Sequence, residues 1–283
     1  MIEQTAKARS LALAASVACV AVSACAGVTG VSPSAGLTPG AKYVALGSSY
    51  AAGPGIEPQE MPATRCTRST ANYAHQFAQL RSLMLVDVSC GGARTKDLLE
   101  PWKELPPQLD SVTPDTRLVT ITIGGNDVGY IGYLVRASMC SAGVATSCNQ
   151  PPPTEAAWEA LAQSIRRVAA EVKRRAPNAR VIFVNYVSVL PATGSCAAVG
   201  MTPALADGNR AIARRLAEVT ATAARDSGAE LLDAATLSQA HDACSATPWI
   251  GGYAGPDGKM SRVPFHPNKD GMTAIAGALA GMK

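Results

Sequence analysis

Residues 117–127 read Arg-Leu-Val-Thr-Ile-Thr-Ile-Gly-Gly-Asn-Asp, and this stretch decides the fold class. Aliphatic and β-branched side chains fill positions 118–123, which predicts a buried strand. Two glycines end the run, because glycine weakens a strand and lets the backbone turn tightly or approach a ligand. The strand therefore delivers a polar side chain, that of Asn126, to one edge of a predicted sheet.

Four further runs have the composition of strands, over residues 43–47, 84–89, 180–186 and 229–233. Apolar residues recur with helical spacing between and after them, over residues 69–80, 154–175, 203–226 and 270–280. Strands that alternate with helices predict an α/β fold with a parallel sheet, here of five strands. Nothing within residues 41–283 resembles a domain linker, so we expect a single domain over that range.

The first predicted strand ends at Gly47 and opens into Ser48, Ser49 and Tyr50. Ligands of open α/β folds bind at the carboxyl edge of the sheet, where this turn should lie. Ser49 would stand beside a helix N-terminus, whose N–H groups favour negative charge. The simpler interpretation is that one of these serines only caps the helix, since Ser is a preferred N-cap residue.

Two more stretches place polar groups near the same edge. Asn126 offers a side-chain N–H donor, as an oxyanion hole requires, although Gly-Gly-Asn-Asp is also ideal for a plain turn. His266 precedes the last predicted helix, and Pro267 fixes the turn that holds it. A surface histidine before a helix would explain the same residues.

In this order, the stretches resemble the sequence blocks of the SGNH/GDSL family of hydrolases. The four similar blocks are Gly47-Ser48-Ser49-Tyr50, Cys90-Gly91-Gly92-Ala93, Gly124-Gly125-Asn126-Asp127 and Phe265-His266-Pro267-Asn268. The resemblance implies Ser49 as nucleophile and His266 as general base. It also implies an oxyanion hole made of the backbone N–H groups of Ser49 and Gly92 with the side-chain amide of Asn126.

The same resemblance implies a three-layer α/β/α sandwich, flavodoxin-like, with five parallel strands and no cofactor. It is strongest toward the secreted actinobacterial esterases and lipases with three disulfides. The implied activity is that of a serine esterase or lipase acting on an ester substrate, one that contains an acyl chain, with the enzyme a monomer. The apolar, Cys-flanked residues 130–160 favour acyl chains over sugars. The alternatives are a ligand-binding surface lipoprotein without turnover and a deacetylase of acetylated glycans.

The sequence departs from the family pattern at two positions. Ser48 replaces the Asp of the first block, and Val263 stands where the family carries an Asp three residues before the histidine. Another group must then orient His266. The candidates are a backbone carbonyl in the 248–264 loop, such as that of Val263, and the carboxylate of Asp257. We expect the carbonyl, because Asp257 is nine residues from His266 in a loop rich in Gly and Pro.

The N-terminus has the features of an export signal over residues 1–24. Lys7 and Arg9 precede an apolar stretch over 11–22, which is too short to span a bilayer comfortably. Val-Ser-Ala-Cys at 22–25 resembles a bacterial lipobox, which predicts a lipid anchor at Cys25. Ordinary signal-peptidase cleavage, with Cys25 incidental, is the alternative. The small and Gly/Ser/Pro-rich residues up to 40 predict a flexible tether over 25–40.

Six cysteines lie beyond the signal, and an even number in an exported chain predicts three disulfides. We favour pairing in sequence order, because a short Gly-containing segment separates the middle two. The predicted bridges are Cys66–Cys90, Cys140–Cys148 and Cys196–Cys244. Buried free thiols are the alternative. No Cys-x-x-Cys pair or Cys/His zinc spacing occurs, so we expect no metal site.

Composition and motifs argue against other classes of protein. The formal charge of +4 is a small excess over 283 residues, which makes nucleic acid a poor partner. Neither the phosphate-binding nor the dinucleotide-binding glycine motif is present. The nucleophile elbow of α/β-hydrolases needs Gly-x-Ser-x-Gly, and Ala51 occupies the position of its last glycine.

Overall fold

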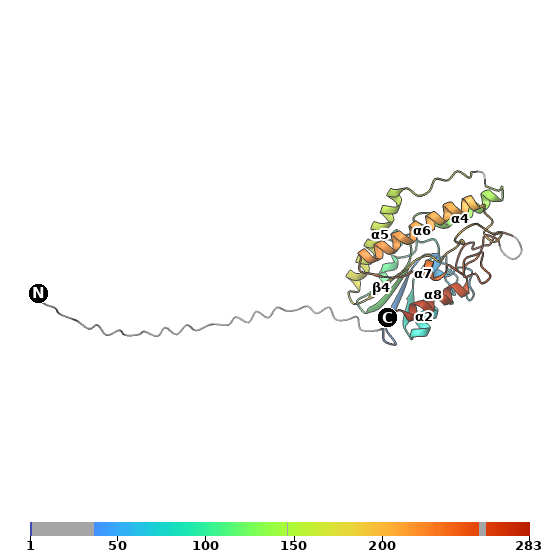
Figure 1. Ribbon diagram of the computed structural model, residues 1–283. Helices are drawn as coiled ribbons and strands as arrows, with labels where there is room; N and C mark the ends of the chain where they lie inside the picture. The colour runs from blue at the N-terminus through green and yellow to red at the C-terminus, as the bar shows by residue number, and fades with distance from the viewer. Residues whose placement is uncertain (2–36, 146, 255–258) are drawn as a thin grey trace. The chain divides into compact units, whose positions relative to one another are not determined.

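Five parallel strands form one sheet in the order β2-β1-β3-β4-β5, in the computed structural model shown in Figure 1. The structure describes residue 1 and residues 37–145, 147–254 and 259–283. The strands are β1 (Lys42–Gly47), β2 (Met84–Asp87), β3 (Thr116–Thr122), β4 (Arg180–Val184) and β5 (Glu230–Leu232). The predicted α/β class and all five predicted strands are confirmed. Most of the export segment and tether, with Cys25, lies outside the described residues.

Helices cover both faces of the sheet and complete three layers (Figure 1). The long helices α5 and α6 pack against each other on one face, and α2 and α8 pack together on the other. The helices are α1 (Ser49–Ala52), α2 (Tyr73–Arg81), α3 (Thr95–Leu99), the 3-10 helix η1 (Gln108–Ser111), α4 (Tyr130–Ser141), α5 (Glu155–Arg175), α6 (Pro203–Asp226), α7 (Ala234–Leu237) and α8 (Lys269–Gly281).

The central strand β3 is buried on both faces, as its nearly continuous apolar sequence requires. Six of its seven residues are buried, and only Arg117 is exposed. It pairs with β1 on one side and β4 on the other. The carboxyl ends of β1 and β3 therefore lie next to each other, which brings the segments after Gly47 and Thr122 together.

Two parts of the helical prediction are wrong in detail. The predicted helix over 69–80 begins only at Tyr73, because the Asn72 side chain accepts a hydrogen bond from the His75 N–H at 3.1 Å and caps it. Helix α4 occupies residues 130–141, where no helix was predicted. Its sequence contains Gly132 and β-branched residues that weaken the helical signal.

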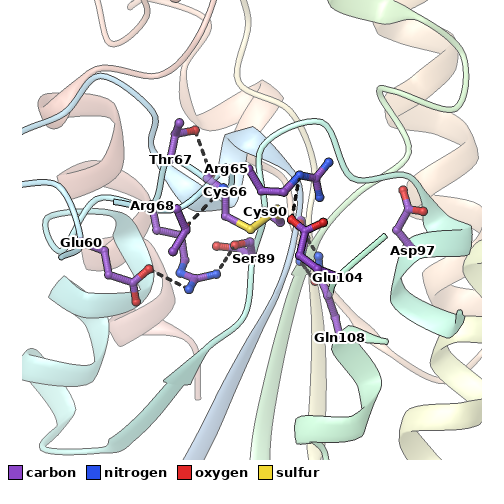
Figure 2. The surroundings of a disulfide bond; sticks show 12 residues. Glu60, Arg65, Cys66, Thr67, Arg68, Ser89, Cys90, Asp97, Glu104 and Gln108 are labelled. Carbon is purple, nitrogen blue, oxygen red and sulfur yellow. Dashed lines mark hydrogen bonds and ion pairs between the residues drawn. A yellow bond between two sulfur atoms is a disulfide. The ribbon is translucent and has the colours of Figure 1, made fainter. Parts of the chain in front are cut away.

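The three predicted disulfides are confirmed: Cys66–Cys90, Cys140–Cys148 and Cys196–Cys244. The first joins the loop before α2 to the loop after β2 (Figure 2). Within the described ranges, no helix is long and apolar enough to cross a bilayer. The same ranges contain no group of three or more His, Cys, Asp and Glu side chains arranged to hold a metal ion.

Candidate active site

The turn after β1 presents Ser49 at the carboxyl edge of the sheet. Gly47 makes this turn with φ 141°, and a Cβ at that position would lie 2.4 Å from the Thr122 carbonyl oxygen. Ser48 donates its N–H to the same carbonyl at 2.9 Å, so the turn is fixed against the end of β3. The Gln108 side chain holds the other side, binding the N–H and the carbonyl of Gly47 at 2.8 and 3.0 Å. Helix α1 then begins at Ser49 itself.

His266 lies against Ser49, although 217 positions separate them in the chain. The Nε2 atom of His266 is 2.8 Å from the Ser49 hydroxyl oxygen, and its Nδ1 atom is 2.8 Å from the Pro264 carbonyl oxygen. A carbonyl only accepts, so Nδ1 carries the proton and Nε2 is left to accept from Ser49. Burial lowers the pKa of His266 below its ordinary value, and the bond to Pro264 opposes this shift.

A backbone carbonyl does face His266, but it belongs to Pro264 and not to Val263. Phe265 has a left-handed φ of 59°, which turns the chain so that the imidazole faces the carbonyl two residues before it. The Tyr50 hydroxyl donates to the Phe265 carbonyl and stabilises this uncommon conformation. Asp257, the alternative candidate, lies outside the described residues.

The predicted oxyanion donors come from three segments. The Asn126 amide donates one hydrogen to the Ala93 carbonyl at 2.8 Å, which fixes the side chain and leaves its second N–H unused. Gly92 has φ 86°, a conformation that favours glycine. Neither the Ser49 nor the Gly92 backbone N–H donates to another group within the described part of the chain. Three N–H groups are thus left available for a negatively charged oxygen.

A disulfide and hydrogen bonds hold the loop that precedes Gly92 (Figure 2). Cys90 is in the disulfide with Cys66, and the Gly91 N–H donates to the Cys66 carbonyl at 3.0 Å. The Arg68 guanidinium donates to the Ser89 carbonyl at 2.8 Å. These bonds are made at Cys90 and at the residues on either side of it, so they restrict the backbone that leads into Gly92.

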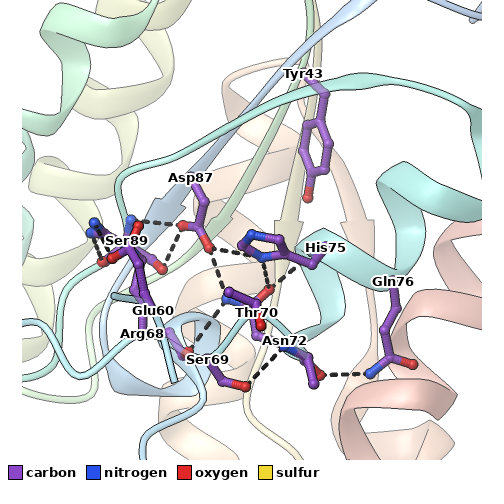
Figure 3. A network of polar contacts seen from close by, with 12 residues as sticks. Tyr43, Glu60, Arg68, Ser69, Thr70, Asn72, His75, Gln76, Asp87 and Ser89 are labelled. Atoms are coloured by element: carbon purple, nitrogen blue, oxygen red, sulfur yellow. Dashed lines mark hydrogen bonds and ion pairs between the residues drawn. The ribbon is translucent and has the colours of Figure 1, made fainter. Parts of the chain in front are cut away.

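A buried carboxylate also supports this loop (Figure 3). Asp87 accepts from the Ser89 N–H at 2.9 Å, the Ser89 hydroxyl at 2.7 Å and the Asn72 amide at 2.7 Å. Burial raises the pKa of Asp87, and the hydrogen bonds from Ser89 and Asn72 oppose this rise. Asn72 caps α2 at the same time, so the helix and the loop share one polar centre.

Asp127 joins the third sequence block to helix α3. Its carboxylate accepts from the Thr95 N–H at 3.1 Å and from the Thr95 hydroxyl at 2.5 Å. Burial raises its pKa, and the bonds from Thr95 counteract this. No role was predicted for Asp127 from the sequence. The signal in the sequence was Asp127 itself, because a carboxylate is a favoured partner for the free N–H groups at the start of a helix.

Comparison with known proteins agrees with this geometry. Residues 45–274 match the GDSL-like Lipase/Acylhydrolase family. The chain belongs to this family. It is 37% identical to Lipase 2 of Streptomyces coelicolor over 255 residues, which cover 83% of each chain. The GDSL-type chain is therefore a carboxylic ester hydrolase of the esterase/lipase kind, as the sequence predicted.

Two solved structures are similar to this GDSL-type hydrolase along most of its length. The extracellular lipase from Streptomyces rimosus has a TM-score of 0.70 and 29% identity, covering 86% of this chain and 99% of the lipase. The phospholipase A1 from Streptomyces albidoflavus also has a TM-score of 0.70, with 26% identity, covering 85% and 98%. These likenesses confirm the predicted SGNH-type fold.

We expect Asp257→Asn to leave kcat within a few-fold of the wild-type value, because the Pro264 carbonyl already accepts the Nδ1 proton of His266. Steady-state hydrolysis of a p-nitrophenyl ester measures this. Where an Asp holds the catalytic histidine, the change to Asn costs about 10⁴-fold in kcat. A loss of that order would make Asp257 the third member of a triad.

Proposed function

We propose that this hydrolase cleaves carboxylic esters through an acyl-enzyme on Ser49. The single observation that carries the proposal is the 2.8 Å contact between the Ser49 hydroxyl and Nε2 of a His266 whose Nδ1 is already bound to a carbonyl. A nucleophile, its base and a group that orients the base are the parts that covalent catalysis needs. A ligand-binding protein without turnover has no need of this alignment.

The steps follow from the arrangement. Ser49 attacks the ester carbonyl carbon as its proton passes to Nε2 of His266. The Asn126 amide and the Ser49 and Gly92 N–H groups bind the resulting oxyanion. His266 returns the proton to the departing alkoxide, which leaves an acyl group on Ser49. Water, activated by His266, then releases the acid and restores the hydroxyl. One chain supplies every group that these steps use, so a monomer is sufficient for the reaction, and we propose it as the active form.

We propose an acyl-chain ester as the substrate. The names of the relatives, lipase and phospholipase A1, support this, as does the apolar sequence of residues 130–160 beside the third block. A series of p-nitrophenyl esters from acetate to palmitate, run beside an acetylated xylooligosaccharide, tests the proposal. We expect kcat/KM to rise with chain length beyond acetate. Highest activity on the acetylated sugar would favour the deacetylase alternative.

We propose further that residues 1–24 direct export, that Cys25 becomes a lipidated N-terminus, and that 25–40 is the tether. The sequence Val-Ser-Ala-Cys at 22–25 and the extracellular relative from Streptomyces rimosus support export.

Cys25→Ser should move the enzyme from the membrane fraction to the soluble exported fraction, because the acylated residue is lost. Immunoblots of both fractions and the mass of the mature N-terminus measure this; Ser23→Ala, which keeps a small residue in the motif, is the control. A wild-type enzyme that is already soluble and begins downstream of Cys25 would contradict the anchor.

A further inference from the structure

Tyr186 places a buried hydroxyl against Gly125, the residue before the proposed oxyanion donor Asn126. It lies two residues after the end of β4, and only 7% of its surface is exposed. Its hydroxyl accepts the Gly125 N–H at 2.8 Å and lies 3.4 Å from the Ser48 hydroxyl. The fit is close, since a Cβ at residue 125 would lie 2.7 Å from the tyrosine. The absence of a side chain at Gly125 therefore leaves the space that this ring occupies.

The bond to Gly125 acts on the residue next to it. Asn126 is held through its side chain by the Ala93 carbonyl, and Asp127 is held by Thr95. Neither contact fixes the peptide between Gly124 and Gly125, which carries the N–H bound by Tyr186. The carbonyl side of this peptide is held by the backbone, because the Gly124 carbonyl accepts the Asp127 N–H at 3.1 Å. The N–H side is held by the Tyr186 hydroxyl at 2.8 Å, so this side chain completes the restraint.

The same ring also contacts the support of the general base. The rings of Tyr186 and Tyr50 lie 4.6 Å apart, and the Tyr50 ring lies 5.2 Å from the His266 imidazole. The Tyr50 hydroxyl is bound to the Phe265 carbonyl. Tyr186 therefore stands between the segment that carries the oxyanion donor and the segment that carries the base.

We propose that Tyr186 is a positioning residue, whose hydroxyl binds the Gly125 peptide and so aims the Asn126 amide at the oxyanion. This assignment rests on the proposed function. Burial raises the pKa of Tyr186 to about 12, and the bonds to Ser48 and Gly125 oppose the rise. The hydroxyl thus keeps its proton at neutral pH and can accept from Gly125 while it donates toward Ser48. In this chain Ser48 stands where the family pattern has Asp. The polar groups next to the nucleophile are therefore the hydroxyls of Ser48 and Tyr186, 3.4 Å apart.

Tyr186→Phe removes the hydroxyl and keeps the ring. We expect kcat for a p-nitrophenyl ester to fall about 10–100-fold with KM unchanged within twofold, because small displacements of a catalytic group are costly. Tyr43→Phe is the matched control. It removes another buried tyrosine hydroxyl, bound to Thr120 at 2.6 Å, from the core. The two variants should lose similar thermal stability, and the control should keep its kcat. Wild-type kcat in Tyr186→Phe would overturn the assignment.

A double-mutant cycle separates this assignment from the function on which it rests. Once Asn126→Ala has removed the donor, Tyr186→Phe should lower kcat by less than about threefold further, because the two groups act as a unit. Fully multiplicative losses would show that Tyr186 acts elsewhere and would overturn the proposal. An Asn126→Ala variant with wild-type kcat would contradict the oxyanion hole itself, and the assignment would fall with it.

Discussion

His266→Ala lowers kcat by about 10⁵–10⁶-fold, the scale seen when the base of a serine hydrolase is removed. The Ser49 hydroxyl is then left without the group 2.8 Å away that takes its proton. Steady-state hydrolysis of a p-nitrophenyl ester measures the loss, with residual activity from contaminating esterase subtracted using Ser49→Ala. His241→Gln is the control, because His241 stacks on Trp249 and bonds to Thr247 and makes no hydrogen bond to Ser49 in the described part of the chain. A His266→Ala enzyme within tenfold of wild type would remove this residue from the mechanism.

The pH profile gives a second test of His266. The residue acts as a base only when neutral, so kcat/KM must fall as the pH drops through its pKa. Burial lowers that pKa below the ordinary 6.5, which shifts the acid limb downward. The midpoint of the acid limb should therefore lie below about pH 6.5. A midpoint above 7 would indicate a carboxylate partner that stabilises the imidazolium.

Asn126→Ala lowers kcat by about 10²–10³-fold with little change in KM, because the lost donor binds the transition state and not the ground-state ester. The Ala93 carbonyl also loses its partner, which costs stability. Thermal unfolding of Asn126→Ala measures the loss of stability, and kcat at a temperature where the variant is fully folded measures the loss of the donor, so the two effects are separated. An Asn126→Ala enzyme with unchanged kcat would remove Asn126 from the oxyanion hole.

The sequence predicts the inner strands β1, β3 and β4 well, because burial on both faces requires a nearly continuous run of apolar residues. The run at 118–123 shows this most clearly, and the glycines at or after the ends of β1, β2 and β3 mark where polar groups reach the sheet edge. Parallel pairing of β1 with β3 then brings Ser49 near Asn126. Two helices were predicted less well. Helix α4 was missed because it contains Gly132 and β-branched residues, and the start of α2 was misplaced because it depends on the side chain of Asn72.

The supports of the site lie beyond local sequence patterns. His266 bonds to the carbonyl of Pro264 and not to that of Val263 because Phe265 has a left-handed φ. A phenylalanine in the sequence gives no sign of that conformation. Asp127 meets Thr95 and Tyr186 meets Gly125 only after the strands have aligned. Such contacts join residues 32 and 61 positions apart, and no spacing rule predicts them. Short motifs therefore mark the reacting groups, whereas the fold supplies their positions.

The most direct measurement of the central claim is covalent labelling with a p-nitrophenyl phosphonate, which traps a serine nucleophile as a stable ester. We predict release of one equivalent of p-nitrophenol, complete loss of esterase activity, and a mass increase confined to the tryptic peptide that contains Ser49. Ser49→Ala should show neither the label nor turnover, and Ser48→Ala should still take up the label on Ser49. A label on another residue, or a Ser49→Ala enzyme that still hydrolyses esters at the wild-type rate, would contradict the account.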